Sequence, residues 1–338
     1  VSTRGHYGLV RGVPKKYIFP AESRPGKLEF PVCTDIPVID LAYNHPAQTI
    51  QQVIRACQQF GIFQVINHGV CENLLDETMN MYKEFFKLPG EYKAKFYSND
   101  FNKSCRLFSS TLAYNTEDFH YWRDNFTHRC HPLEEYIQSW PDKPTKYREV
   151  VGEYSIETRK LLYKILEMIC KGLGLESGYF EGEVSKTQLL SVNHHIPCPN
   201  PRLTLGMPVH SDPNLITLLH QSHVPGLQIL REDDGQWIGV PPHPHALIFI
   251  PGVQLKVISN DRFITPVHRV VTHLKEARTT IGVFLGPSPE SIIKPADPLV
   301  RTEPALFRPF TYPEFFKVFT AGAICDAQLA LNHFRNKS

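Results

Sequence analysis

The sequence has no strong excess of charge of either sign and no apolar stretch long enough to span a membrane. Its 338 residues contain 36 Lys and Arg against 34 Asp and Glu, a formal net charge of +2, without a long basic run. Nucleic acids and anionic membrane surfaces are therefore disfavoured as partners. A transmembrane helix needs about 18 consecutive apolar residues, and no such run is present. Residues 1–20 also lack the apolar core of a signal peptide.

Paired cysteines are missing as well. The eight cysteines are scattered along the chain, and none forms a C-x-x-C pair. In a chain of this length the pattern indicates free thiols in a reducing compartment, and it argues against a disulfide framework or a cysteine-based zinc site. We expect a cytoplasmic protein, a monomer, that acts on a small molecule.

The first half of the chain has helical periodicity. Apolar residues recur at helical spacing in residues 47–61, 72–89 and 146–175, each of which predicts a helix. Residues 62–69 predict a short strand that enters a turn. Residues 90–145 are rich in aromatic side chains and are expected to be irregular.

The second half consists of short apolar segments separated by Pro, Gly and Asp. The predicted strands are LLSVNHHI, LITLLHQ, LQILRE, QWIGV, ALIFI, LKVISN, HRVVTH and TTIGVFLG. Asp234-Gly235 predicts the turn of a hairpin between the third and the fourth. Short strands without helices between them are typical of a β-sandwich or jelly roll. Residues 311–323 predict a C-terminal helix, with Thr311 as its N-cap and Pro313 in its first turn.

These patterns predict an α+β protein with a double-stranded β-helix (jelly roll) core, an N-terminal helical region and a C-terminal helix. We expect residues 1–185 to form the helical and irregular region that packs on the core. The jelly roll is expected at 186–290, and a lid segment with the C-terminal helix at 291–338. The hydrophobic content of 42% is sufficient for such a core.

The segment MPVHSDPNLITLLHQ places an imidazole and a carboxylate two positions apart. In extended backbone His210 and Asp212 project to the same side, so they could be two metal ligands or a surface ion pair. His268 follows 58 positions later (268 − 210) at the start of another predicted strand. A jelly roll can bring the two strands together. Two histidines and a carboxylate on one face of a metal form the facial triad of non-haem Fe(II) oxygenases.

Arg278 and Thr280 also lie two positions apart on one predicted strand, ten positions after His268 (278 − 268). A guanidinium and a hydroxyl on one side of a strand match a single carboxylate. Taken alone, the pair is explained better as an edge arginine beside a surface threonine.

Other histidines fit structural roles better than ligand roles. His128 and His131, beside Cys130, are spaced too tightly for a usual zinc site. The remaining ones are expected in turns or as packing residues: His68, His220, His223, His243 and His245.

Taken together, the H-S-D motif, the later histidine and the R-x-T motif resemble the pattern of the plant-type 2-oxoglutarate/Fe(II) dioxygenases. The similarity extends from about Ile36 to about Phe316 and follows the family's order and spacing. The segments that carry it are FGIFQVINHGV, NHHIPCPNPRLTLG, VPGLQIL, DGQWIGVPPHPHALIFI, KVISNDRF and VHRVV.

The resemblance implies that His210, Asp212 and His268 bind Fe(II). It also implies that 2-oxoglutarate chelates the iron and pairs its far carboxylate with Arg278 and Thr280. Reaction with O₂ would release succinate and CO₂ and oxidise the substrate, with ascorbate as the reductant.

The chain departs from the family at several positions. Thr280 stands where serine is usual, and it retains the hydroxyl. At His195 the family has a tyrosine that hydrogen-bonds the cosubstrate, so we assign His195 and Asn193 to cosubstrate binding. Because a histidine can also be charged, 2-oxoglutarate affinity is expected to be weaker or more pH-dependent. Pro251 and Val253 replace polar residues, with an effect that the sequence leaves open.

By the family's pattern, residues 103–130 and 305–316 close the substrate pocket. The pocket candidates are Phe108, Tyr114, Tyr121, Arg123, Phe126, Phe307 and Phe310, with Phe119, Trp122 and Tyr312 nearby. Such a lining suits a flat or polycyclic apolar substrate. The alternatives are that half of these side chains pack the core, and that Arg123 pairs with Asp124 or with the protein framework and does not touch the substrate.

The segment HYWRDNFTHRCHPLEEYIQSWPDKPTKYREVV resembles the hyoscyamine-hydroxylase group of the family. HSDPNLITLL and VPPHPHAL also resemble members that oxidise salicylate or flavonoids. We therefore expect an enzyme that hydroxylates a plant specialised metabolite, for example an alkaloid. Demethylation, desaturation and epoxidation are alternatives within the family. A non-catalytic jelly-roll binding protein, and an oxidase that uses ascorbate without 2-oxoglutarate, are alternatives outside that reaction.

Overall fold

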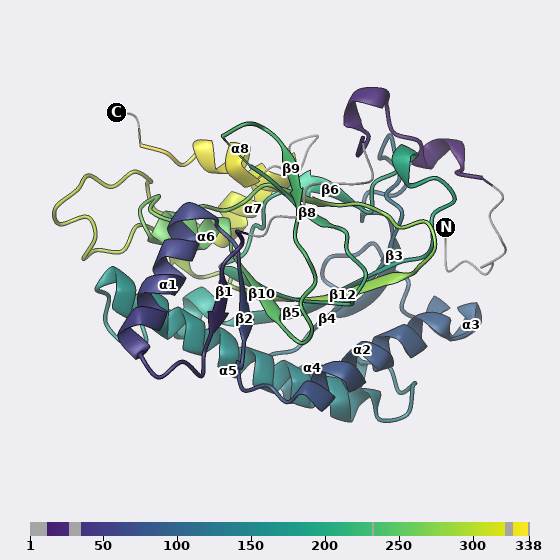
Figure 1. The fold of residues 1–338 in the computed structure, drawn as a ribbon, viewed down its shortest axis with the longest axis horizontal. Helices are drawn as coiled ribbons and strands as arrows, with labels where there is room; N and C mark the ends of the chain where they lie inside the picture. Colours follow the sequence, from purple (N-terminus) through teal and green to yellow (C-terminus); the bar gives the residue numbers. More distant parts are fainter. Residues whose placement is uncertain (1–11, 27–34, 232, 322–326, 337–338) are drawn as a thin grey trace.

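The computed structural model describes residues 12–26, 35–231, 233–321 and 327–336. Two β-sheets face each other, and long helices cover the outer side of the larger sheet (Figure 1). The elements of the first half are β1 (Val38–Asp40), α1 (Pro46–Gln59), β2 (Phe63–Ile66), α2 (Glu72–Lys87), α3 (Gly90–Ala94), β3 (Cys105–Ser109), β4 (Asp124–Arg129), α4 (Leu133–Tyr136) and α5 (Tyr147–Leu173). Those of the second half are β5 (Thr187–His195), β6 (Met207–His210), β7 (Ile216–Gln221), β8 (Leu227–Leu230), β9 (Trp237–Gly239), β10 (Leu247–Pro251), α6 (Val253–Ile258), β11 (His268–Val270), β12 (Arg278–Gly286), β13 (Ile292–Ile293), β14 (Phe310–Thr311), α7 (Tyr312–Ala321) and α8 (Ala327–Asn332).

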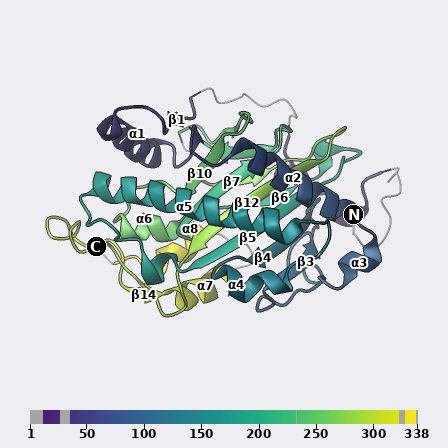
Figure 2. The same cartoon turned by 90° about the horizontal axis from the view of Figure 1, so that it is seen from below.

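The large sheet has the strand order β1-β2-β10-β7-β12-β5-β4-β3, and the small sheet has the order β6-β11-β8-β9. Helices α2 and α5 lie along the outer face of the large sheet (Figure 2). The face toward the small sheet is called the inner face below. The predicted α+β class and double-stranded β-helix core are confirmed.

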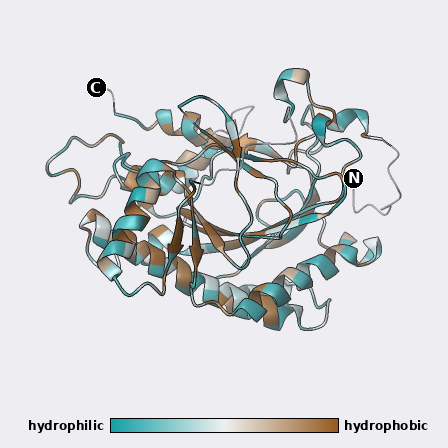
Figure 3. Ribbon diagram, viewed as in Figure 1, coloured by the Kyte–Doolittle hydropathy of each residue, from teal (hydrophilic) through white to brown (hydrophobic). Residues whose placement is uncertain are grey.

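Strand β12 shows how the two faces differ. Its residues Ile281, Val283 and Leu285 belong to the main hydrophobic core, with side chains from α2 and α5. Arg278 and Thr280 alternate with them and therefore project from the inner face. Apolar strands at the centre and polar outer helix surfaces are visible in Figure 3.

The three predicted helices of the first half are confirmed as α1, α2 and α5. Helix α5 ends at Gly174, whose φ of 70° lets its N–H reach the carbonyl oxygens of Cys170 and Lys171. The C-terminal helix begins at Tyr312, and Thr311 and Glu314 form a reciprocal capping pair there. Residues 322–323 of the predicted helix lie outside the described residues. No described helix is both long and apolar enough to cross a membrane.

Two expectations are wrong. Residues 90–145 are not irregular, because β3 and β4 extend the large sheet beyond β5. The segment LKVISN is not a strand: it forms most of α6, because Gly252 brings the chain against Asn214. A Cβ at Gly252 would lie 1.9 Å from the Asn214 carbonyl oxygen, and Val253 N–H donates to the carbonyl of Asp212.

One core cluster contains side chains from all three predicted regions, from Ile39 to Phe334. The boundaries at 185 and 290 stay a prediction.

Candidate active site

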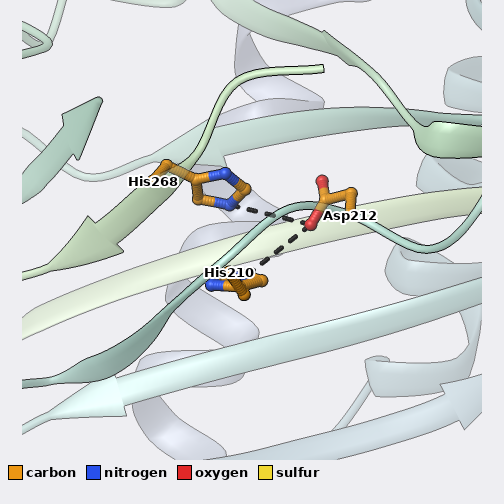
Figure 4. A group of neighbouring side chains, drawn as sticks. All are labelled: His210, Asp212 and His268. Atoms are coloured by element: carbon orange, nitrogen blue, oxygen red, sulfur yellow. Dashed lines mark ion pairs between the residues drawn. The ribbon is translucent and has the colours of Figure 1, made fainter. Parts of the chain in front are cut away.

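Three predicted ligands converge between the two sheets. His210 ends β6 and His268 begins β11, and the two are register partners in the small sheet. Asp212 lies just after β6. Its Oδ1 is 3.6 Å from Nε2 of His210 and 3.6 Å from Nε2 of His268 (Figure 4). Among the described residues this is the one cluster of three or more His, Cys, Asp or Glu whose ligand atoms lie close enough to hold a metal ion.

Hydrogen bonds orient each of these ligands. Nδ1 of His210 donates to the carbonyl oxygen of Pro208 at 2.8 Å, and Nδ1 of His268 donates to that of Pro266 at 3.1 Å. A carbonyl only accepts, so Nδ1 carries the proton and each Nε2 presents a lone pair. Oδ2 of Asp212 accepts the Thr217 hydroxyl at 2.5 Å, which leaves Oδ1 toward the histidines.

The electrostatics of this cluster favour a cation. Burial, and then the neighbouring His268, lower the pKa of His210 to about 3, although Asp212 opposes the shift. A neutral imidazole is the form that binds metals. Nε2 of His210, Nε2 of His268 and Oδ1 of Asp212 face one point, an arrangement that a divalent ion stabilises.

Arg278 forms a second part of the site, which favours the binding of an anion. Its side chain is 2% exposed, with Nε donating to the carbonyl of Val224 at 3.1 Å and Nη2 donating to Oε1 of Gln221 at 3.2 Å. Its Nη1 is buried and has no partner among the described residues. Burial lowers the pKa of Arg278 only to about 10, so it stays charged at neutral pH. A buried guanidinium with an unused donor fits a ligand carboxylate.

Thr280 and His195 complete the surroundings of this cation. Thr280 projects to the same side of β12 as Arg278, and His195 is the register partner of Arg278 on β5. The His195 ring is 1% exposed, and neither ring nitrogen has a partner among the described residues. Gly206 makes room for it, because a Cβ there would lie 2.7 Å from the ring.

His195 is neutral in this environment. Burial, followed by the charges of Arg278 and Arg123, lowers its pKa well below 6.5. The expectation that this position could be charged is therefore not supported, and His195 can donate one N–H to a ligand.

Asn193 is the anchor of a polar network on the inner face. Its Oδ1 accepts from Nη1 of Arg123 and from Nδ2 of Asn125, both at 2.9 Å. This fixes the amide so that Nδ2 points away from both donors. Asp124 accepts the Ser109 hydroxyl at 2.5 Å, and Arg123 is tied to the protein framework, through Asn193 and through the carbonyl of Ser110, as the second of the two alternatives for this side chain expected.

The predicted pocket aromatics separate into two groups. Phe126 packs against Phe85 with ring centroids 4.3 Å apart, on the helix-covered face of the sheet. Phe310 packs 4.3 Å from Phe334, and Phe307 is 1% exposed in the same core. The prediction that Phe126, Phe307 and Phe310 line the pocket is corrected, because these three side chains belong to the hydrophobic core.

The other aromatic candidates lie outside the main core. Phe108 is on the inner face, paired with Asn125, and it is 7% exposed without belonging to any apolar cluster of the described residues. Tyr114 stacks on His120 at 4.1 Å, and Tyr121 packs 5.2 Å from Phe19 of the N-terminal segment.

Two functional neighbours were not predicted from the sequence. Thr217 orients Asp212 and Gln221 holds Arg278. Both could have been found from the spacing of alternate residues along β7 after the H-S-D motif. Tyr312, which the sequence placed in the segment that closes the pocket, is influenced by the metal cluster: burial and then the charge of Asp212 raise its pKa.

The fold and the site define a non-haem oxygenase with a two-histidine, one-carboxylate centre. Residues 186–287 match the family model of the 2OG-Fe(II) oxygenase superfamily, and residues 36–143 match the model of the non-haem dioxygenase in morphine synthesis N-terminal region. The chain belongs to the 2-oxoglutarate/Fe(II) oxygenases, which use Fe(II), 2-oxoglutarate and O₂, and it is an oxidoreductase.

Similar proteins cover nearly the whole chain. Hyoscyamine 6-dioxygenase of Hyoscyamus niger is 43% identical over 319 residues, which are 91% of this chain and 92% of that protein. Flavanone 3-dioxygenase 2 of Oryza sativa subsp. japonica is 38% identical and covers 96% of this chain and 94% of its own. The crystal structure of JOX2 in complex with 2OG, Fe and JA has a TM-score of 0.85 at 30% identity, covering 98% of this chain and 96% of that one.

Proposed function

We propose that the chain hydroxylates a small plant specialised metabolite at an iron held by His210, Asp212 and His268. The observation that carries this proposal is the convergence of three unprotonated ligand atoms, each oriented by its own hydrogen bond. Bound iron supplies O₂ activation, coupled to decarboxylation of 2-oxoglutarate to succinate and CO₂.

The protein's own residues position the cosubstrate. Arg278 offers its free Nη1 to the far carboxylate of 2-oxoglutarate, Thr280 adds a hydroxyl, and His195 donates one N–H. Asn193 has its Nδ2 available beside them. These groups are buried, so they act on the ligand in surroundings from which water is largely excluded.

The substrate class is supported by the relatives. The 43% identity to hyoscyamine 6-dioxygenase supports an alkaloid, and the 38% identity to a flavanone 3-dioxygenase supports a flavonoid. Oxidation of salicylate, and demethylation, desaturation or epoxidation in place of hydroxylation, are further outcomes that the same site could support. The intact ligand set argues against a non-catalytic binding protein.

We also propose that the protein is a cytoplasmic monomer. All six described cysteines are free, five of them buried, which supports a reducing compartment.

The test is an assay of succinate release from 2-oxoglutarate, with Fe(II) and ascorbate, over a broad panel of plant metabolites. Mass spectrometry of the same reactions identifies any product that is heavier by one oxygen atom. We expect substrate-dependent succinate from the native chain and none from Asp212→Ala. Asp297→Ala, at an exposed ion pair with Lys294, is the matched control and should react normally.

If the panel gives no succinate and iron does not bind, the enzyme proposal fails. Activity without 2-oxoglutarate that persists in Arg278→Ala would instead indicate the ascorbate-dependent oxidase.

A further inference from the structure

One row of side chains on the inner face of the large sheet is rich in nitrogen. Arg278 on β12 is paired with His195 on β5, and Arg123 directly precedes Asp124, the partner of His194. The register therefore places Arg123 next to His195, on the side away from Arg278. Neighbouring strands lie about 4.8 Å apart, so the backbones of Arg278 and Arg123 are separated by about 10 Å.

The two arginines are tethered in different directions. Arg278 is held toward β7 through Gln221 and the loop after it. Arg123 is held on the other side by Nε, which donates to the carbonyl of Ser110 at 2.7 Å, and by Nη1, which donates to Asn193 at 2.9 Å. Because the proposed function assigns Arg278 to the cosubstrate, Arg123 is a second and separate cation on the same inner face.

Arg123 has no acidic partner in the described part of the chain. Its Nη2 makes no hydrogen bond there, and no described carboxylate forms an ion pair with it. Glu117, whose charge acts on Arg123, is already occupied: its oxygens accept the hydroxyls of Ser110 and Thr111 and the ring N–H of His120. Burial lowers the pKa of Arg123 to about 10, so the guanidinium is charged and incompletely paired.

The inner face around Arg123 holds no acidic side chain. Its residues on β3, β4 and β5 alternate with the core residues and are Arg106, Phe108, Asn125, Thr127, Ser191 and Asn193. Arg106 is 8% exposed, and its Nε has no partner among the described residues. These strands thus combine Arg106 with neutral polar groups and one buried phenylalanine, beside Arg123, and they present no carboxylate on this face.

Given the proposed function, we propose that the substrate carries a carboxylate, which Arg123 binds through its free Nη2. Phe108, one row further along the sheet, packs against the apolar body of this acid. Arg106 adds positive potential. Arg123 is therefore a specificity-determining residue of the substrate pocket.

The position of Arg123 relative to the metal cluster supports this assignment. Trp122, next to Arg123, donates its backbone N–H to the carbonyl of Leu205 at 2.9 Å, so Arg123 lies beside the segment that leads into β6 and His210. A substrate held by its acid at Arg123 extends from β4 toward His210. A protonated amine in this place would meet like charge, which disfavours a cationic alkaloid.

The experiment compares three probes that share one skeleton and differ in charge. They are 3-phenylpropionate, 3-phenylpropanamide and 3-phenylpropylamine. Binding is measured by anaerobic calorimetry on the full chain loaded with Fe(II) and 2-oxoglutarate. We expect the acid to bind about 10- to 100-fold more tightly than the amide, since a hydrogen bond to a charged partner contributes this much. The amine should bind most weakly.

The variants assign that preference to one side chain. Arg123→Gln should lose the preference for the acid, Arg123→Lys should keep part of it, and Arg55→Gln, at an exposed arginine of α1, should keep all of it. The absorption of the Fe(II)–2-oxoglutarate complex shows separately whether cofactors bind. If that absorption is missing in the native chain, the proposed function fails. If it is present, the inference is overturned by equal or tighter binding of the amide or amine, by an acid that does not bind at millimolar concentration, or by an unchanged preference in Arg123→Gln.

Discussion

The replacement Arg278→Gln tests how the site holds 2-oxoglutarate. The guanidinium is buried, two of its nitrogens are used by Val224 and Gln221, and Nη1 is free for a carboxylate. Removing one partner of a buried, hydrogen-bonded charge pair costs about 2–5 kcal/mol, which corresponds to a loss of affinity of at least about 30-fold. The variant should also unfold more easily, by about 1–3 kcal/mol for each protein acceptor that stays unpaired.

The assay follows the absorption of the anaerobic Fe(II)–2-oxoglutarate complex during a titration with 2-oxoglutarate. Arg278→Lys should be intermediate, because it keeps the charge and loses the planar fork. Arg55→Gln, on the exposed surface of α1, is the control for charge loss and should titrate like the native chain. The reasoning is refuted if Arg278→Gln binds 2-oxoglutarate within a few-fold of the native affinity while remaining folded.

Two further predictions concern the metal ligands and the core. Thr217→Val removes the hydroxyl that orients Asp212, so the variant should bind Fe(II) about 10- to 100-fold more weakly. A competition with a chelator measures this affinity. An unchanged affinity would show that the hydrogen bond is dispensable. Burial lowers the pKa of His128 to about 3 and that of His194 to about 4, from the usual 6.5, so the native state favours their neutral forms. The stability that they contribute is complete above pH 6.5 and is lost as the pH falls toward 4, by up to about 1.4 kcal/mol per pH unit for each group. Urea unfolding at pH 7 and pH 5 measures the loss, and equal stability at both values would contradict it.

The metal cluster and Arg278 were predictable because their signals are local. His210 and Asp212 are two positions apart, as are Arg278 and Thr280, and the jelly-roll order brings His268 to them. Local spacing left each pair ambiguous by itself, and the resemblance of the combined motifs to the 2-oxoglutarate/Fe(II) dioxygenases assigned their roles.

The substrate side was harder to predict because it depends on which face each strand presents. Phe126 and Asn125 are neighbours in sequence, yet one lies in the core and the other on the inner face, and only the pairing of β4 with β5 decides between them. The core position of Phe310 likewise depends on Phe334, near the C-terminus. The short apolar segment at α6 fits a strand or a helix equally, and the close contact of Gly252 with Asn214 decides its form.

The central claim is that His210, Asp212 and His268 together bind iron. Anaerobic calorimetry with Fe(II) tests it most directly, on the native chain, on Asp212→Ala and on the surface control Asp297→Ala. The account predicts one Fe(II) bound per chain in the native protein and in the control, and a loss of binding in Asp212→Ala with the fold retained. Native Fe(II) affinity in Asp212→Ala would contradict it.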